Sequence, residues 1–501
     1  MANPLFARKP ISLILEEMAG DNRLRRVLGP VALSSLGIGA IIGTGIFVLT
    51  GVAAHDKAGP ALMLSFAVAG MTCIFAALCY AEFASMVPVA GSAYTYAYAT
   101  LGELMAWIIG WDLVLEYAVG SATVAHGWSH YFQNFIGLFG MSLPAALTQA
   151  PFDYSPETGQ LISTGTVVDL PAVVVAFGVT VVLVKGIRES ASFNTAMVIV
   201  KLAVVLFVIV VGSFYVNPDN WTPFAPYGLT GISFFGHTVA GQTGAGGEPL
   251  GMLAGASVIF FAYIGFDSVS THSEEAKNPS RDVPIGIIAS LVICTVLYIL
   301  VSAVLTGMVK YDQIDINAPV PSAFAAVGMK SGQLLVSLGA LAGITSVLLV
   351  LMLSQPRVML AMARDGLVPA HFFGAVHPKF CTPWKSSILT GAFVALLGGF
   401  LPLRILAELV NIGTLLAFAI VCGAVLVLRK THPELPRPFR CPWVPFLPIC
   451  GIACCLVLML SLPPENWLRL VIWLAIGLAI YFGYSRHHSF LRKHAGGQPK
   501  S

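Results

Sequence analysis

Long apolar stretches follow one another along almost the whole chain and are separated by short polar segments. Runs of about 20 residues with few charges are long enough to cross a bilayer as helices. The pattern predicts 12 such spans. They fall at residues 28–50, 62–85, 104–132, 167–184, 194–213, 253–272, 284–308, 333–362, 385–401, 405–428, 445–461 and 467–484. The sequence therefore predicts an all-α polytopic membrane protein.

The first predicted span has an unusual centre. Gly37, Gly39, Gly43 and Gly45 lie in its middle, and each glycine weakens a helix by about 1 kcal/mol relative to alanine. A broken helix is tolerated at membrane depth only where its free backbone groups are buried in protein or line a cavity. We therefore predict that this helix breaks and that the break forms a binding site.

The sixth predicted span repeats this feature. It is apolar from Gly255 to Phe266 and turns polar at Asp267, before the helix should have left the membrane. Two interrupted helices five spans apart predict two five-helix halves in opposite orientations, the plan of an inverted repeat. The predicted boundaries are a cytoplasmic tail at 1–26, the first repeat at 27–213, an extracytoplasmic loop at 214–252, the second repeat at 253–428, two further helices at 429–484 and a cytoplasmic tail at 485–501.

Composition agrees with a membrane protein, and charge sets its orientation. Hydrophobic residues make up 57% of the 501 residues and charged residues 10%, with a mean hydropathy of +0.83. Cytoplasmic loops carry an excess of Lys and Arg, which predicts a cell (inner) membrane protein with both termini in the cytoplasm. The net charge of +3 is spread over loops and gives no sign of nucleic-acid binding. In this orientation the basic residues of the outer loops are Lys57, Lys310, Lys330, Arg404 and Arg469.

The chemistry of the two breaks suits an α-amino acid. The amides of Gly43, Thr44 and Gly45 would head the second half of the first helix, where free N–H groups and the helix dipole hold a carboxylate. Carbonyl groups released near Ile41 can accept from an ammonium group, and carbonyls around Phe261, Ala262 and Ile264 of the sixth span would complete that site. The alternatives are a Gly39–Gly43 helix-packing motif and an ordinary sixth helix with an aromatic face.

Two ionisable residues inside predicted spans are candidates for proton coupling. Lys201 lies in the interior of the fifth span, and intramembrane charges usually mark ion pathways. It could gain and lose a proton during transport, or stand as a fixed ammonium in the place of a sodium ion; the alternative is snorkelling to the interface. Glu116 in the third span could relay protons, and a structural hydrogen bond between helices is an equal alternative.

Other polar residues give weaker signals. His126 and His130 have no partner at metal-ligand spacing and are interpreted as interfacial histidines. Asp267 is interpreted as a polar end of the second half-helix rather than a substrate ligand. The chain contains no nucleotide-binding loop, catalytic triad or zinc motif, so an enzyme, an ATP-driven pump, a metal site and a bound cofactor are not expected.

Several short motifs in combination resemble the cationic amino acid transporter family of the amino acid–polyamine–organocation superfamily. They are Gly37–Gly51, Pro88–Tyr98, Phe260–Ser270, Glu274–Pro279 and Ala361–Gly366. The resemblance covers spans 1 to 10 and implies a leucine-transporter-type fold, amino acid transport by alternating access and, in bacterial members, coupling to protons. It also implies substrate-backbone binding by Ile41, Gly43, Thr44, Gly45, Phe261, Ala262 and Ile264. Lys201 matches the lysine that occupies the sodium site of related transporters.

The expected function is proton-coupled symport of L-amino acids. Leu351 in the eighth span is assigned to the side-chain wall of the pocket, where cationic carriers have a small polar residue. Its bulk favours small or medium neutral substrates such as alanine, with cationic amino acids as the second choice. The partners expected are the substrate, protons and the lipid bilayer. The alternatives are an amino acid or polyamine exchanger without net proton coupling and a non-transporting amino acid sensor; the oligomeric state stays open.

Overall fold

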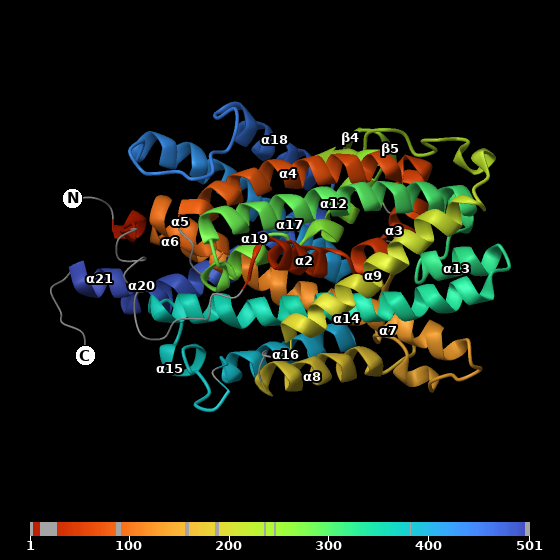
Figure 1. Ribbon diagram of the computed structural model, residues 1–501, viewed down its shortest axis with the longest axis horizontal. Helices are drawn as coiled ribbons and strands as arrows, with labels where there is room; N and C mark the ends of the chain where they lie inside the picture. Colours follow the sequence, from red (N-terminus) through yellow and green to blue (C-terminus); the bar gives the residue numbers. More distant parts are fainter. Residues whose placement is uncertain are drawn as a thin grey trace.

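The fold is a bundle of long helices, seen in Figure 1 in a computed structural model. The structure describes residues 4–10, 28–86, 92–155, 160–185, 190–234, 237–244, 247–380 and 382–495. The α-helices are α2 (Pro30–Ile41), α3 (Thr50–Ala53), α4 (Leu62–Met86), α5 (Ser92–Thr100), α6 (Glu103–Val114), α7 (Gly120–Gly137), α8 (Leu170–Lys185), α9 (Ser190–Ser213), α10 (Met252–Ile259), α11 (Ser268–Thr271), α12 (Pro279–Met308), α13 (Pro319–Ala326), α14 (Lys330–Arg364), α15 (Ala370–Phe373), α16 (Trp384–Phe400), α17 (Leu403–Thr431), α18 (Phe446–Leu460), α19 (Pro464–Ile480), α20 (Arg486–His488) and α21 (Phe490–Ala495).

Short 3₁₀ and π segments, labelled η, extend or interrupt these helices. The 3₁₀ segments are η1 (Pro4–Phe6), η4 (Gly59–Ala61), η6 (Ala145–Leu147), η7 (Pro218–Trp221), η8 (Phe260–Tyr263), η9 (Ser273–Glu275) and η10 (Tyr311–Gln313). The π segments are η2 (Gly45–Leu49), η3 (Ala54–Ala58), η5 (Leu115–Val119) and η11 (Tyr481–Ser485). Strands occur in loops as three antiparallel pairs: β1 (Phe152–Ser155) with β2 (Gln160–Ser163), β3 (Ile232–Phe234) with β4 (His237–Ala240), and β5 (Gln242–Thr243) with β6 (Pro249–Leu250).

Each of the predicted ranges contains helix. Among the described residues, eight helical stretches are long and apolar enough to cross a membrane, and four further apolar helices of 10 to 17 residues are shorter. The shorter helices are α2, α8, α16 and α18. The first of them is short because it ends at the predicted break. The prediction of a mostly helical protein with several membrane-spanning helices is therefore confirmed.

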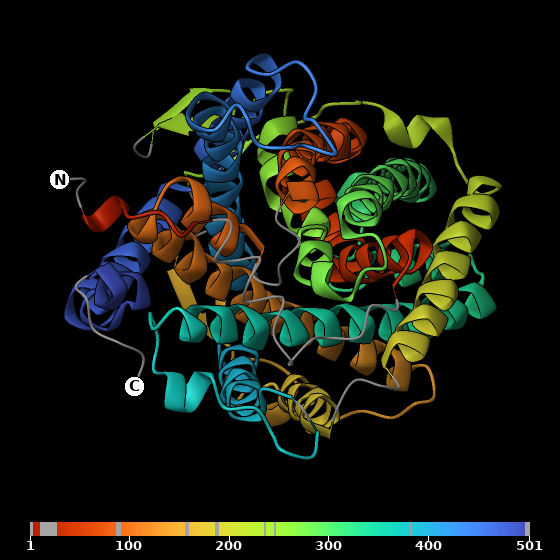
Figure 2. The same cartoon turned by 60° about the vertical axis from the view of Figure 1, so that its left-hand side comes forward.

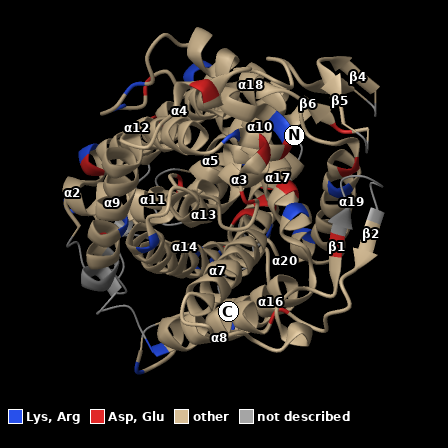
Figure 3. Ribbon diagram, turned by 90° about the vertical axis from the view of Figure 1, so that its right-hand side faces the viewer, with Lys and Arg blue, Asp and Glu red and all other residues tan. Residues whose placement is uncertain are grey.

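Apolar side chains face both the centre of the bundle and its outer surface. In the interior, α12 packs against α4 and α2 (Figure 2). On the outer surface Val174 is 59% exposed and Leu206 is 50% exposed, as expected of helices that face lipid rather than water. Seen from the end that lies to the right in Figure 1, the helices carry few charged residues (Figure 3). The core is thus defined by close packing, not by polarity alone.

Both described terminal segments fold against the same end of the bundle (Figure 1). Lys9 forms a buried ion pair with Asp365 at the end of α14, with 2.6 Å between Nζ and Oδ1. Arg492 of α21 pairs with Glu103 at the start of α6, with 3.0 Å between Nε and Oε1. The Glu103 amide also donates to the Ala7 carbonyl at 3.0 Å. The predicted tails are therefore partly folded onto the transmembrane core.

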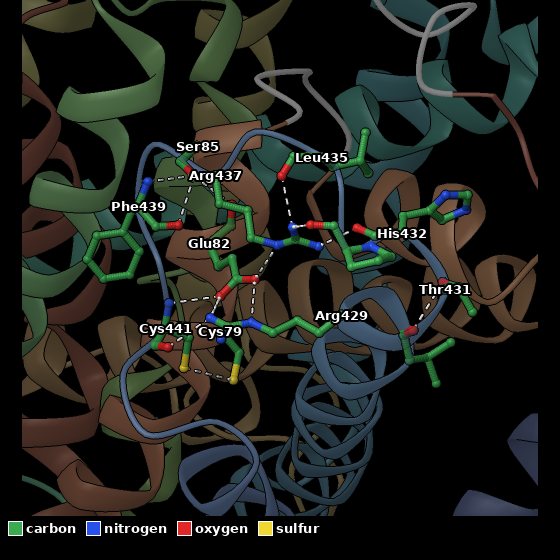
Figure 4. Close-up of polar contacts among 12 residues, drawn as sticks. Cys79, Glu82, Ser85, Arg429, Thr431, His432, Leu435, Arg437, Phe439 and Cys441 are labelled. Atoms are coloured by element: carbon green, nitrogen blue, oxygen red, sulfur yellow. Dashed lines mark hydrogen bonds and ion pairs between the residues drawn. The ribbon is translucent and has the colours of Figure 1, made fainter.

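A buried carboxylate ties α4 to the segment between α17 and α18 (Figure 4). Glu82 accepts two hydrogen bonds from Arg429, at 3.1 and 2.7 Å, and one from Arg437 at 3.2 Å. The Cys441 amide donates to the same carboxylate at 2.8 Å. Because the Glu82 and Arg437 side chains are 1% and 5% exposed, their charges depend on each other for stabilisation.

Replacing Glu82 by glutamine should therefore destabilise the protein by about 3 kcal/mol, since it leaves Arg437 buried without its counter-charge. The measurement is the Tm of the purified protein in detergent, which should fall by several degrees. Glu434→Gln is the matched control, because the Glu434 side chain is 66% exposed in its pair with His432 and such pairs contribute little. Equal Tm values for both variants would contradict the assigned role of Glu82.

Candidate functional site

The first predicted helix breaks between Ile42 and Thr44. Helix α2 ends at Ile41, and Ile42 is extended with φ −74° and ψ 105°. The chain becomes helical again through the π segment η2, and the Phe47 amide closes onto the Gly43 carbonyl at 3.1 Å. Amides at the start of a helix have no carbonyl of their own helix to bond. The first turn of this half-helix therefore presents free donors at the break.

The second break follows η8. Helix α10 ends at Ile259, η8 covers the next turn, and Ile264 is extended with φ −59° and ψ 136°. Gly265 then has a φ of +112°, which a residue with a Cβ rarely adopts. The chain turns helical again in the short α11. Both interrupted helices predicted from the sequence are thus present.

The two breaks lie directly against each other. A Cβ added to Gly45 would overlap Ala262, and one added to Gly265 would lie 2.9 Å from the Ala40 Cβ. Tyr298 of α12 joins them, because its hydroxyl is 2.8 Å from the Ile41 carbonyl and 3.0 Å from the Ala262 carbonyl. Its single proton can be donated to one of the two at a time. Tyr298 therefore holds carbonyl groups from both breaks, a contact that the sequence did not predict.

A closed pocket lies at this junction. Its walls are Ala40, Ile41, Thr44, Gly45, Val124, Phe261, Ile264, Val347 and Leu351. Its cavity volume is about 10 Å³. All nine residues are buried. The pocket is therefore shut off from solvent and nearly filled by its own walls.

The pocket contains most of the residues predicted to bind substrate. Ile41, Thr44, Gly45, Phe261, Ile264 and Leu351 line it, whereas Gly43 and Ala262 stand behind the wall, against Val347 and Gly45 respectively. Ala40, Val124 and Val347 are additional wall residues. Val124 and Val347 could not be predicted as wall residues, because an apolar residue in a spanning helix can face lipid, protein or a pocket.

One polar atom in the wall has no protein partner. The Thr44 hydroxyl is buried and makes no hydrogen bond within the described residues. A buried hydroxyl without a partner costs free energy. It stands at the N-terminus of the second half-helix, where N–H groups and the helix dipole favour an anion. This corner of the pocket can therefore bind a carboxylate.

Lys201 lies beside the first break and outside the pocket wall. Its ammonium group donates to the Gly39 carbonyl at 2.5 Å and to the Ile42 carbonyl at 2.9 Å. The side chain is fully buried, so it does not reach the interface by snorkelling. A charge from α9 is thereby bound to carbonyl groups at the end of α2, where the break leaves acceptors without their usual helical donors.

Glu116 meets a second carboxyl group. It lies in η5, next to the side chain of Asp267, and neither Glu116 oxygen has a hydrogen-bond donor within the described residues. Asp267 in turn accepts a hydrogen bond from the Tyr117 hydroxyl. Asp267 thus lies between α10 and α11, in contact with the third predicted span, and is not only the polar end of a half-helix. A contact between two acidic residues 151 positions apart could not be predicted from the sequence.

Comparison with known proteins places the chain among membrane transporters. The family model for amino acid permeases matches residues 28–481. Over 98% of its length the chain is 48% identical to the branched-chain amino acid permease BcaP of Bacillus subtilis (strain 168), covering 100% of that protein. It is 46% identical to the methylthioribose transporter of the same organism, with 98% and 99% of the two chains covered. It is 38% identical to the vacuolar cationic amino acid transporter 4 of Arabidopsis thaliana, with 86% and 68% covered.

Proposed function

Because the chain belongs to the amino acid permease family of membrane transporters, we propose that it is a secondary active symporter that carries a neutral L-amino acid together with a proton. The observation that carries the proposal is the unpartnered Thr44 hydroxyl at a half-helix N-terminus inside a closed apolar pocket. A carboxylate fits that corner. The similarity to cationic amino acid transporters, expected from the sequence motifs, is confirmed at the level of the family.

The proposed architecture is that of 12 membrane spans with an inverted repeat of five and five. The eight long helical stretches and four shorter apolar helices support this number, if α2 and η2 to η3 form one interrupted span. The two breaks, five predicted spans apart, support the repeat. Both described terminal segments lie at one end of the bundle (Figure 1), as an even number of crossings requires. We assign this end to the cytoplasm and the protein to the cell membrane.

The pocket wall favours a small or medium aliphatic side chain. Val124, Val347 and Leu351 form its apolar part, and none of the nine wall residues is charged. A cationic side chain would lack a carboxylate partner there, which is costly at a buried site. The similarity to a branched-chain amino acid permease agrees with a neutral substrate. We therefore propose alanine or the branched-chain amino acids rather than arginine or lysine.

Proton coupling is assigned to Lys201 and to Glu116 with Asp267. Lys201 binds carbonyl groups of the first break directly, so a change in its charge changes how firmly α2 is held. Two adjacent carboxyl groups out of water cannot both stay ionised, so Glu116 and Asp267 share a proton. Because Asp267 follows the second break, this proton is close to the segment that binds substrate. Each break thus has one proton-binding group beside it.

Transport then requires the closed pocket to open alternately to each side. A cavity of about 10 Å³ cannot admit an amino acid without movement of its walls. The walls come from α2, η2, η8, α7 and α14, so movement of the interrupted helices relative to α7 and α14 opens it. Binding of substrate and proton shifts the populations of these states by differential affinity.

Reconstitution into vesicles tests the proposal against its alternatives. A symporter accumulates labelled amino acid under an inward proton gradient when the vesicle interior contains no amino acid. An exchanger accumulates label only when amino acid is present inside. A sensor binds amino acids, as a thermal-shift screen would detect, but moves none. Uptake that ignores the proton gradient would contradict the symport mechanism while leaving transport intact.

The methylthioribose transporter of Bacillus subtilis supplies a second substrate class for the same assay. Methylthioribose has neither a carboxylate nor an amino group, so it could not use the charged ends of the two breaks. The assay should therefore include it beside alanine and leucine. Competition by methylthioribose, with none by amino acids, would overturn the proposed substrate class.

Leu351 should control the size of the substrate. Replacing it by alanine enlarges the apolar wall, and the ratio of leucine to alanine uptake should rise about ten-fold, the effect of roughly one or two methylene groups in a hydrophobic pocket. Leu348→Ala is the matched control, because Leu348 is fully buried on the same helix but does not line the pocket. An equal change of the leucine-to-alanine uptake ratio in both variants would contradict the assignment of Leu351 to the pocket wall.

A further inference from the structure

Two histidines of α7 are in direct contact with each other. His126 and His130 lie one turn apart on α7, and their Nε2 atoms are 3.0 Å apart. Their contact was not expected from the sequence, and both are shielded from solvent: His126 is 6% exposed and His130 is partly exposed. From this geometry we infer that His126 and His130 form a chelating site for a divalent transition-metal ion such as Zn²⁺.

The distance between the two nitrogens suits a shared metal ion. Zinc binds imidazole nitrogen at about 2.0–2.1 Å in tetrahedral geometry, so two neighbouring ligands lie about 3.3 Å apart. Histidines at positions i and i+4 of a helix share one face, which places both rings on the same side. A small movement of either ring changes the observed 3.0 Å into this separation. The backbone already presents the two ligands together.

The surroundings of His126 Nδ1 determine the tautomer of this ring. His126 Nδ1 is 3.4 Å from the Gly398 carbonyl and 3.3 Å from Asp169 Oδ2, and both of these are acceptors. Nδ1 therefore carries the proton and Nε2 has a free lone pair. The same orientation, in which the ligand's other N–H faces a carboxylate or carbonyl, is typical of metal-binding histidines. Asp169 is thus a positioning residue for the proposed ligand.

The Asp169 carboxylate also supplies the negative charge that stabilises a buried cation. Asp169 is fully buried, and its Oδ1 accepts from the Ser129 hydroxyl and, at 3.2 Å, from the Ala172 amide. Within the described residues no Lys or Arg pairs with it. A buried carboxylate without a cation is costly. A metal ion on the histidine pair places positive charge next to Asp169 and offsets that cost.

The segment of α7 that carries the pair is held firmly in place. A Cβ at Gly127 would lie 3.2 Å from the Thr44 hydroxyl oxygen, and the Tyr131 hydroxyl donates to the Phe47 carbonyl at 2.5 Å. Gly127 lies between the two histidines and Tyr131 follows the second, so packing against Thr44 and the hydrogen bond to η2 hold this segment of α7. Rigid ligands lose little entropy on binding.

The proposed site has two protein ligands, and water completes the coordination. No group of three or more His, Cys, Asp or Glu side chains is placed to hold a metal within the described residues. Two neutral imidazoles with Asp169 behind one of them fit a borderline ion such as Zn²⁺ better than Ca²⁺ or Mg²⁺, which prefer oxygen ligands. The contact between the two Nε2 atoms places the single N–H proton of His130 between the rings. When the metal binds, this proton moves to Nδ1 of His130, so both rings bind through Nε2 as neutral ligands.

Zinc titration of the full-length protein after removal of any histidine tag tests this inference. The probe is Zn²⁺ in competition with a chromophoric chelator, with calorimetry in buffers of different ionisation enthalpy. We expect one zinc ion per protein at micromolar affinity with no net proton release, because both imidazoles are neutral before and after binding. His126→Ala and His130→Ala should each weaken binding at least ten-fold, and Asp169→Asn should weaken it about ten-fold without removing a ligand.

Two controls separate this site from other zinc ligands. The double substitution His487→Ala and His488→Ala removes an exposed pair of histidines in α20 and should leave the titration unchanged. Should His130→Ala fail to fold, His130→Gln retains a polar side chain of similar length and removes the imidazole. X-ray absorption should detect two imidazole nitrogens and oxygen. Undiminished binding in the His130 variants, sulfur in the first coordination shell, or no binding at millimolar Zn²⁺ would overturn the proposal.

Discussion

Replacing Lys201 by alanine is expected to reduce proton-driven amino acid uptake at least about 100-fold. The substitution removes both hydrogen bonds to the Gly39 and Ile42 carbonyls, and a hydrogen bond from a charged donor contributes about 1.5–3 kcal/mol. Loss of two such bonds exceeds 2.8 kcal/mol, and every 1.4 kcal/mol corresponds to a factor of ten. The measurement is initial uptake into vesicles under an inward proton gradient, per folded protein.

Two further variants separate the charge of Lys201 from its ability to release a proton. Arginine keeps the charge and cannot be deprotonated in proteins, so Lys201→Arg should also fail if proton release is part of the cycle. Lys57→Met is the matched control, because Lys57 is likewise buried and bonds a carbonyl, that of Pro249, away from the pocket. Proton-dependent uptake that persists in Lys201→Ala would refute the coupling role.

Replacing Gly45 by alanine is expected to reduce substrate binding at least about ten-fold. The new methyl group would overlap the Ala262 backbone, so the two breaks must move apart, and overpacking of this kind costs about 1–3 kcal/mol. Separation would also weaken the contact of Tyr298 with both breaks. The measurement is ligand-induced thermal stabilisation of the purified protein with alanine and leucine, together with uptake.

Gly178→Ala is the matched control for this substitution. Gly178 lies within α8, and a Cβ added there meets nothing within 4 Å, so alanine should leave binding unchanged and stabilise the helix by about 1 kcal/mol. Comparable loss of binding in both variants would indicate a general effect of removing glycines. Retained binding in Gly45→Ala would show that the two breaks need not be in contact.

Local pattern was sufficient to predict the helices and both interruptions. Apolar runs of about 20 residues predict which helices cross the membrane, and the glycines of the first span predict where that helix is interrupted. Six of the eight predicted substrate-binding residues line the pocket, because backbone chemistry at a break depends on neighbours in sequence. Gly43 and Ala262 do not line it, since each faces a residue from another helix, Val347 and Gly45.

Contacts between distant helices could not be predicted from one sequence. Tyr298 bonds carbonyl groups of both breaks, and Glu116 meets Asp267, but neither pairing leaves a periodic signal. The same holds for His126, whose partner Asp169 lies on another element. A polar residue in an apolar span signals that some partner exists. Which partner it has follows only from the three-dimensional packing.

The ion pairs of the two terminal segments have a consequence for biosynthesis. Lys9 is 356 positions from Asp365, and Ser489 is 386 positions from Glu103, to which it donates a hydrogen bond. The chain emerges from the ribosome N-terminus first, so more than 380 further residues must be synthesised before Ser489 and Arg492 can reach Glu103. This corner of the bundle is therefore completed late in membrane insertion. A chain truncated before Ser489 would leave the buried Glu103 carboxylate without the donors that Ser489 and Arg492 supply.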